Sequence, residues 1–188
     1  RDRLRSRGLG DVYKRQGADG VVIGSLNADG TLNTEQMQEM MEAAGSCAVT
    51  MHRAFDVCAD PFEALKKSAE LGVDTILTSG QEADCFAGCW LLKKLVQLTD
   101  QNWSDSRRVT ILAGAGVTSA NIAEIAKKTG VRAFHMSGKR LLESGMRYRN
   151  ERVHMGLGSL SEFECYRTDE AEIRRAAEIL RTLGEDGR

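Results

Sequence analysis

The sequence has no long apolar run and no secretory signal. Although 41% of its 188 residues are hydrophobic, no stretch approaches the ~18 consecutive apolar residues that a membrane-spanning helix needs. The first sixteen residues are basic and lack both an apolar core and a small-residue cleavage site. We interpret residues 1–16 as a non-native or disordered segment and expect one soluble domain over residues 17–188.

The sequence also lacks a disulfide framework. Its cysteines are odd in number and unevenly spaced, and none forms a Cys-x-x-Cys pair. Without a signal peptide, this pattern indicates reduced thiols in a cytoplasmic protein. The five are Cys47, Cys58, Cys85, Cys89 and Cys165.

No basic stripe runs through the chain. The formal net charge is −1, and residues 1–16 hold six of the 26 Lys and Arg but only two of the 27 Asp and Glu. The remainder, with 20 basic and 25 acidic residues, is therefore acidic. This balance argues against nucleic acid or an anionic membrane as a partner.

Short apolar runs alternate with helical patterns from Gly17 onward. Helix starts are indicated by Asn33 with Gln36, and by Asp60 followed by Pro61. Further helices are predicted over about 83–98, after Thr118 or Ser119, and over about 169–183, where Asp169 and Glu172 form a capping box. The predicted strands are 20–26, 47–51, 73–78, 108–117 and 131–136.

Strands that alternate with helices predict a parallel sheet, because the crossover helices make neighbouring strands parallel. Both an open doubly wound sheet and a (β/α)₈ TIM-like barrel fit this pattern. Polar or small residues follow every predicted strand. In an open doubly wound sheet the functional residues gather at the one point where the strand order reverses, so this distribution favours the barrel. Five βα units are too few to close an eight-stranded barrel, so we expect an N-terminally truncated barrel. Its exposed strand edges would favour a homo-oligomer.

The segment His52-Arg53-Ala54-Phe55-Asp56 follows the second predicted strand. An imidazole, a guanidinium and a carboxylate at a strand end suit acid/base catalysis or anion binding. Asp56 could orient His52 or neutralise Arg53. The structural alternative is a salt bridge on the rim beside a hydrogen-bonded histidine. We predict that His52, Arg53 and Asp56 are catalytic.

Glycine-rich turns follow the later strands. Gly114-Ala115-Gly116 lies between an apolar strand and a helix, where backbone N–H groups bind phosphate or carboxylate. The plainer interpretation is a tight turn. Residues 145–150 are interpreted as a lid, an anion clamp or a solvated loop. The predicted ligand-binding residues are Ser79, Gly80, Gly114, Gly116, Ser137, Gly138 and Lys139.

Two groups of soft ligands have spacings that suit Cu(I): Met37, Met40 and Met41, and the pair Cys85 and Cys89. Methionine commonly fills cores and free cysteine is commonly buried, so the structural interpretation is stronger. No Cys₂His₂ or His-Glu-x-x-His motif is present. We predict no metal ligand within this chain.

Six motifs occur together and in order: GADGVVIGSLNADG, VTMHRAFDVCADP, LTSGQEAD, AGAGVTSANI, FHMSGK and GMRYRN. Together they resemble the CutC copper-homeostasis family. The resemblance implies a TIM-like barrel, a cytoplasmic location and a role in copper tolerance or copper binding. The family's candidate copper-binding cysteines lie in early strands that do not match this chain, so Cu(I) would be bound mostly outside it.

Two hypotheses follow. The first is a cytoplasmic protein of copper homeostasis whose partner is the copper ion. The second is a barrel lyase or isomerase that acts on a small phosphorylated or carboxylated metabolite, with His52 as acid/base, Asp56 as its orienter and Arg53 as part of an anion clamp.

Overall fold

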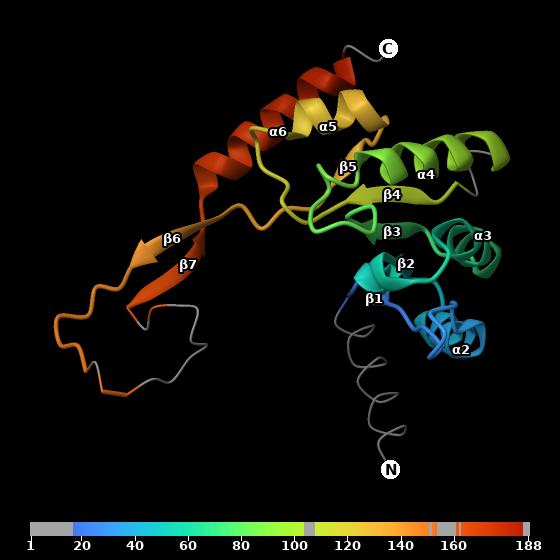
Figure 1. Ribbon diagram of the computed structural model, residues 1–188, viewed down its shortest axis with the longest axis horizontal. Helices are drawn as coiled ribbons and strands as arrows, with labels where there is room; N and C mark the ends of the chain where they lie inside the picture. Colours follow the sequence, from blue (N-terminus) through green and yellow to red (C-terminus); the bar gives the residue numbers. More distant parts are fainter. Residues whose placement is uncertain (1–16, 104–107, 151, 154–160, 162, 186–188) are drawn as a thin grey trace.

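A computed structural model describes residues 17–103, 108–150, 152–153, 161 and 163–185 (Figure 1). The interpretation of residues 1–16 as a non-native segment lies outside these residues. The expectation of one domain over residues 17–188 stays a prediction.

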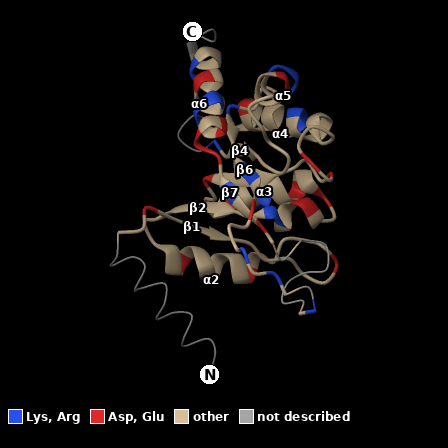
Figure 2. Ribbon diagram, turned by 90° about the vertical axis from the view of Figure 1, so that its left-hand side faces the viewer, with Lys and Arg blue, Asp and Glu red and all other residues tan. Residues whose placement is uncertain are grey.

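A five-stranded sheet forms the centre of the structure, and all its strands are parallel. The strands follow chain order, β1-β2-β3-β4-β5, so each pairs with its neighbours in sequence. Figure 2 shows no charged residue on β1 or β2. The strand bounds are β1 Gly20–Ile23, β2 Ala48–Met51, β3 Thr75–Thr78, β4 Thr110–Ala113 and β5 Ala133–Phe134.

Each of the first four strands is followed by an α-helix before the next strand begins. The short 3₁₀-helix η1 (Arg53–Val57) lies between β2 and its helix. Helix α5 packs between α4 and α6 at one end of the sheet (Figure 1). The helices are α2 Thr34–Ala44, α3 Pro61–Leu71, α4 Cys89–Asn102, α5 Ile122–Thr129 and α6 Glu170–Glu185.

The two faces of the sheet differ in burial. Residues of one face, such as Val49, Met51 and Ile76, are at most 2% exposed and pack in the core with the helices. The alternating residues point to the other face, where Val22 is 63% exposed and Leu77 is half-buried. Because side chains alternate along a strand, one face of the sheet is covered by helices and the other is open.

The prediction of a parallel α/β fold is confirmed, but the described residues form an open sheet and not a closed barrel. Strands β1 and β5 each have one neighbour and form the two edges. An eight-stranded barrel has no such edges, and five strands do not supply the tilt and stagger that closure requires. Barrel closure and truncation stay predictions.

Local signals placed two helix starts correctly. The Asn33 side chain accepts a hydrogen bond from Gln36 N at 3.0 Å, and Asp60 accepts bonds from Phe62 N and Glu63 N. Such caps satisfy backbone donors that a first helical turn leaves free.

Other helix boundaries were wrong. Helix α4 begins at Cys89 and not near residue 83, because Asp84 accepts bonds from the N–H groups of Phe86 and Ala87 and forms a turn there. Neither Thr118 nor Ser119 caps α5, which begins at Ile122.

After β5 the chain forms an antiparallel pair of strands, β6 (Lys139–Glu143) and β7 (Glu164–Thr168). No strand pair was predicted here from the sequence. Figure 1 shows it extending away from the five-stranded sheet. Among the described helices, none is long and apolar enough to cross a membrane.

The difference between the two faces can be measured with a matched pair of valines. Val49→Ala removes core contacts and should lower the free energy of unfolding by about 2 kcal/mol. Val22→Ala should change it by less than about 0.5 kcal/mol, because that side chain is exposed. Urea unfolding of both variants measures the difference. Equal losses would mean that the open face is covered in solution.

Candidate functional site

The carboxylate of Asp56 connects η1 to the end of β3. Its side chain is 6% exposed, and it accepts hydrogen bonds from the hydroxyl of Thr78 and from Ser79 N at 3.0 Å. Arg53 Nε donates to its other oxygen at 2.6 Å. Because its donors come both from η1 and from the end of β3, Asp56 holds these two segments in one arrangement.

Arg53 is positioned by two contacts. Besides the bond to Asp56, its Nη2 donates to Ser79 Oγ at 3.0 Å, and Ser79 Oγ in turn donates to Glu82 O. The side chain of Arg53 remains 47% exposed. One part of the guanidinium is therefore fixed while the rest faces solvent and can bind an anion.

No hydrogen bond between His52 and Asp56 is found among the described residues. Its Nδ1 accepts a hydrogen bond from Ala54 N at 3.1 Å, so the proton of the neutral imidazole lies on Nε2. The ring packs against Gly24, where an added Cβ would lie 2.6 Å from His52 Cε1. The hypothesis that Asp56 orients His52 is therefore wrong in this structure, whereas the hypothesis that Asp56 neutralises Arg53 is confirmed.

A cavity of about 620 Å³ opens at the carboxyl ends of β3, β4 and β5. Predicted residues from three separate segments meet there: Arg53, Gly116 and the Ser137-Gly138-Lys139 segment. The lining also includes Leu77 from the open face of the sheet, together with Ala115, Val117, Thr118, His135, Met136, Arg140, Asp169, Glu172 and Arg175.

Three predicted ligand-binding residues, Ser79, Gly80 and Gly114, lie near this cavity without lining it. Gly114 is buried, with Leu77 and His135 next to its Cα. Ser79 and Gly80 are also buried, and Ser79 contacts the cavity only through Arg53. Lys139 lines the cavity, but its Nζ lies 4.2 Å from the centre of the Tyr166 ring on β7.

The loops that follow β3 and β4 each contain a residue with strained backbone. Gln81 has φ 59° and Ala115 has φ 74°, values that L-residues rarely adopt. A hydrogen bond of 3.0 Å from Cys85 N to Ala115 O joins the two loops. Strain that neighbouring contacts maintain is often found at binding sites, and here it lies beside the cavity.

Helix α6 closes one side of the cavity through Glu172. The carboxylate accepts bonds from Ser119 N at 2.6 Å, from Ser119 Oγ at 2.8 Å and from Arg175. These bonds, the backbone one first, lower the pKa of Glu172 below its usual value. The capping box predicted for α6 is confirmed only for Asp169, whose side chain accepts a hydrogen bond from Ala171 N at 3.0 Å. Its Glu172 half is wrong, because Glu172 bonds the loop after β4 and not its own helix start.

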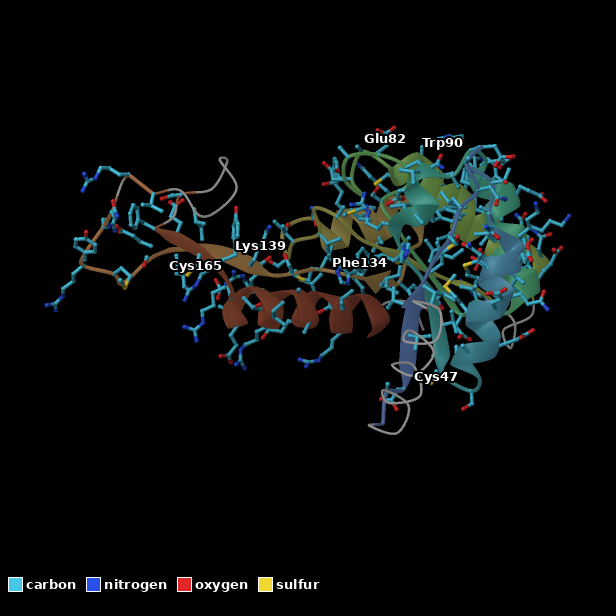
Figure 3. The ribbon with its side chains drawn as sticks, turned by 90° about the horizontal axis from the view of Figure 1, so that it is seen from below. Cys47, Glu82, Trp90, Phe134, Lys139 and Cys165 are labelled. Atoms are coloured by element: carbon cyan, nitrogen blue, oxygen red, sulfur yellow. The ribbon has the colours of Figure 1, made fainter. Side chains whose placement is uncertain are left out.

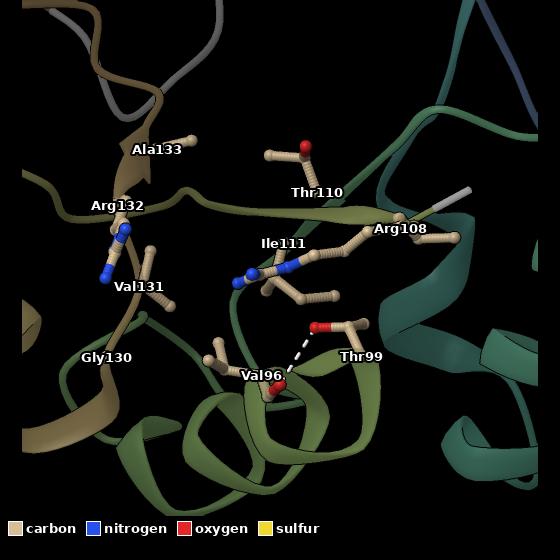
Figure 4. A pocket seen from close by; sticks show the side chains of 10 residues that line it. Val96, Thr99, Arg108, Thr110, Ile111, Gly130, Val131, Arg132 and Ala133 are labelled. Carbon is tan, nitrogen blue, oxygen red and sulfur yellow. Dashed lines mark hydrogen bonds between the residues drawn. The ribbon is translucent and has the colours of Figure 1, made fainter. Parts of the chain in front are cut away.

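A second cavity of about 220 Å³ lies at the opposite, amino-terminal ends of β4 and β5 (Figure 4). Arg108, Arg132 and Thr99 contribute to its lining, and Thr99 Oγ1 donates to Val96 O at 2.8 Å. In parallel α/β folds the active face is the carboxyl end of the strands. We therefore assign the candidate site to the 620 Å³ cavity at the carboxyl ends of the strands.

Comparison with known proteins identifies the family. The model of the CutC family matches residues 10–140. The chain belongs to the CutC family. A family protein CutC from Bacteroides fragilis is 45% identical over 171 residues, which are 90% of this chain and 66% of the relative. One from Salmonella agona is 41% identical over 170 residues, 90% of this chain and 65% of the relative.

A solved structure from Streptococcus agalactiae, described as a candidate copper homeostasis protein CutC, is also similar. It is 26% identical with a TM-score of 0.59, and the match covers 65% of this chain and 57% of that one. The CutC-family chain spans about two thirds of the length of the curated relatives it matches.

The described part of the chain gathers no group of three or more His, Cys, Asp or Glu residues that could hold a metal ion. Met37 is fully buried in the core, and Met40 and Met41 pack against that core. Burial raises the pKa of Cys58 and of Cys85 to about 11, so both thiols are protonated at neutral pH. Because these side chains are buried or partly buried and the described residues gather no ligand cluster, they do not fit a copper site.

Sequence reasoning missed several residues of the cavity. Arg140, Arg175 and Glu172 come from the segment after β5 and from α6, which are distant in sequence from the earlier loops. His135 also follows a predicted strand, but the sequence analysis did not select it as a site residue. Its position after an apolar strand is the same signal that singled out His52.

Thiol labelling tests the assignment of the buried cysteines. At pH 7.5 iodoacetamide should modify exposed Cys165 first, while Cys58 and Cys85 react only after unfolding. Because both pKa values lie near 11, the two labelling rates should rise as pH approaches that value. Peptide mass spectrometry gives the order. Rapid labelling of Cys58 and Cys85 in the folded protein at pH 7.5 would contradict the assignment.

Proposed function

We propose that this CutC-family chain is a cytoplasmic protein of copper homeostasis, the role given to its solved relative. We further propose that its own part in this role is to bind a small phosphorylated or carboxylated metabolite, and that it does not ligate copper with the described residues. The reduced, unpaired cysteines support the cytoplasmic location.

The observation that carries this proposal is the charge and shape of the 620 Å³ cavity. Arg53, Arg140 and Arg175 line it together with Lys139, against two lining carboxylates, Asp169 and Glu172. Glu172 is already bonded to Ser119 and Arg175. Guanidinium groups suit phosphate and carboxylate, because two N–H donors match two anionic oxygens.

A lyase or isomerase is the second candidate, and His135 favours it. This imidazole is exposed in the same cavity as Arg53. An imidazole can act as a general acid or base. If the protein is a lyase or isomerase, Arg53 and the loop after β4 would hold the anionic group of the substrate while His135 acts as acid or base. His52, the imidazole predicted from sequence, would support the wall beside Gly24.

Inorganic phosphate is the probe that tests anion binding. At about ten times its Kd, phosphate should raise the Tm of the protein by about 3–6 °C. The shift should be much smaller in Arg53→Gln and in Arg140→Gln. Arg132→Gln removes a guanidinium at the opposite end of the strands and should keep the full shift.

Copper is measured in parallel by anaerobic competition with a Cu(I) chelator, and the chelator should retain the metal. The proposal is wrong if phosphate does not raise Tm, or if Arg132→Gln loses as much of the shift as Arg53→Gln. Retention of one Cu(I) per chain without a phosphate effect would favour direct copper binding.

A further inference from the structure

The carboxylate of Glu172 is bound by three donors from two separate parts of the chain. Ser119 N donates to Oε1 at 2.6 Å, and Ser119 Oγ and Arg175 Nη2 each donate to Oε2 at 2.8 Å. Ser119 lies in the loop between β4 and α5, and Arg175 lies on α6. A backbone N–H group, a hydroxyl and a guanidinium that meet at one carboxylate are donors suited to an anionic ligand. They are here called the Ser119–Arg175 subsite.

The Ser119–Arg175 subsite belongs to the 620 Å³ cavity at the carboxyl ends of β3, β4 and β5. Glu172 and Arg175 line this cavity, and so does Thr118, the residue before Ser119. Arg53 lines the same cavity from η1. A ligand that binds the exposed part of the Arg53 guanidinium therefore shares one cavity with a second group of donors.

Helix α6 is held in place by contacts other than those of Glu172. Asp169 N, just before the helix, donates to Gly138 O at 2.8 Å. Ile173, in the first turn, lies so close that a Cβ added to Gly138 would be 2.4 Å from its Cδ1. Figure 3 shows α6 alongside the chain segment that ends at the labelled Lys139. The helix can therefore keep its position when the Glu172 side chain leaves the subsite.

The Glu172 side chain is also close to solvent. It is 19% exposed, and the side chain of Arg175 is 56% exposed. An ion pair near the surface contributes little, because water competes for both groups. A glutamate side chain has several rotatable bonds, so its carboxylate can rotate into water without a change in the backbone. A carboxylate from outside can then take its place.

The donors of the subsite favour a carboxylate over a phosphate. In this structure they bind the two oxygen atoms of a planar group. A phosphate is tetrahedral and carries more charge, whereas only one of the three donors is a cation. Apolar residues of the same cavity suit a ligand that also has an apolar part. They include Leu77, Val117 and Met136.

We propose that the Ser119–Arg175 subsite binds a carboxylate of the metabolite, which displaces the Glu172 carboxylate that occupies the subsite in this structure. This inference rests on the proposed anion-binding function. It narrows the ligand class to metabolites with a carboxylate for this subsite and a second anionic group for Arg53. Glu172 is an internal competitor, so the apparent affinity for a carboxylate falls with the fraction of molecules in which Glu172 occupies the subsite.

Acetate, which has the same carboxylate as a glutamate side chain, is the probe that tests the subsite. Glu172→Ala leaves the three donors without their internal acceptor. Acetate should then bind at least about tenfold more tightly than it binds the wild-type protein, because the competitor is absent. The amide signal of Ser119 in a ¹⁵N NMR titration at constant ionic strength measures both affinities.

Glu170→Ala is the matched control. Glu170 lies in the same helical turn and pairs with Arg174 at 2.5 Å, but its side chain is 85% exposed and does not line the cavity. This variant should bind acetate as weakly as the wild-type protein does. Adding Arg175→Gln to Glu172→Ala should remove at least about tenfold of the affinity for acetate, because the charged donor is lost.

The proposal is overturned if Glu172→Ala gains no affinity for acetate, if Glu170→Ala gains as much, or if Arg175→Gln leaves the gain intact. If Glu172→Ala does not fold, the wild-type protein decides the question. Acetate at high concentration should shift the Ser119 amide signal, and chloride at the same concentration should not. The absence of a shift specific to acetate would overturn the proposal.

The phosphate experiment on Arg53 and Arg140 separates this inference from the proposed function. If phosphate raises Tm but acetate binds Glu172→Ala no more tightly than wild type, anion binding stands and the carboxylate subsite is wrong. If acetate binds Glu172→Ala as expected and phosphate has no effect, the subsite stands and the proposed anion binding at Arg53 is wrong.

Discussion

The arrangement of the loops at the carboxyl ends of the strands depends on the buried carboxylate of Asp56. It bonds the hydroxyl of Thr78 at the end of β3, the backbone of Ser79 and the guanidinium of Arg53. A buried carboxylate must be paired and hydrogen-bonded to be tolerated. Here the same pairing fixes the direction of Arg53, so the residue that stabilises the loop also prepares the cavity to bind an anion.

The one-sided sheet explains where that cavity lies. Helices cover one face through residues such as Met51 and Ile76, and the open face carries Val22 and Leu77. Loops at the carboxyl ends of the strands gather beside this open face, and Leu77 extends from it into the cavity. The described residues of the CutC-family chain thus form a cavity at the carboxyl ends of parallel strands, although the five strands do not close into an eight-stranded barrel.

Sequence predicted the order of elements well, because each unit carries its own local signals. Asn33 and Asp60 start helices as expected, since a cap depends on neighbouring residues. The convergence of Arg53, Gly116 and Gly138 also followed from sequence, because the carboxyl ends of parallel strands share one edge.

The remaining features depend on contacts between distant segments. Glu172 looked like half of a capping box, yet its carboxylate bonds Ser119, 53 positions away. The partner of Asp56 could have been His52 or Arg53, because both lie within one turn of it in sequence. The β6–β7 pair was missed because charged residues interrupt the strand pattern, which only cross-strand pairing reveals.

The most direct test of the central claim is the hydrogen exchange of the Arg53 Nε–H group, measured by ¹⁵N NMR. In the wild-type protein this group should exchange slowly, because it donates to a carboxylate that is 6% exposed. Asp56→Asn should abolish the protection and lower the free energy of unfolding by about 1–3 kcal/mol, since buried donors then lose their acceptor. An Arg53 Nε–H group that exchanges as fast as that of exposed Arg132 in the wild-type protein would contradict the account.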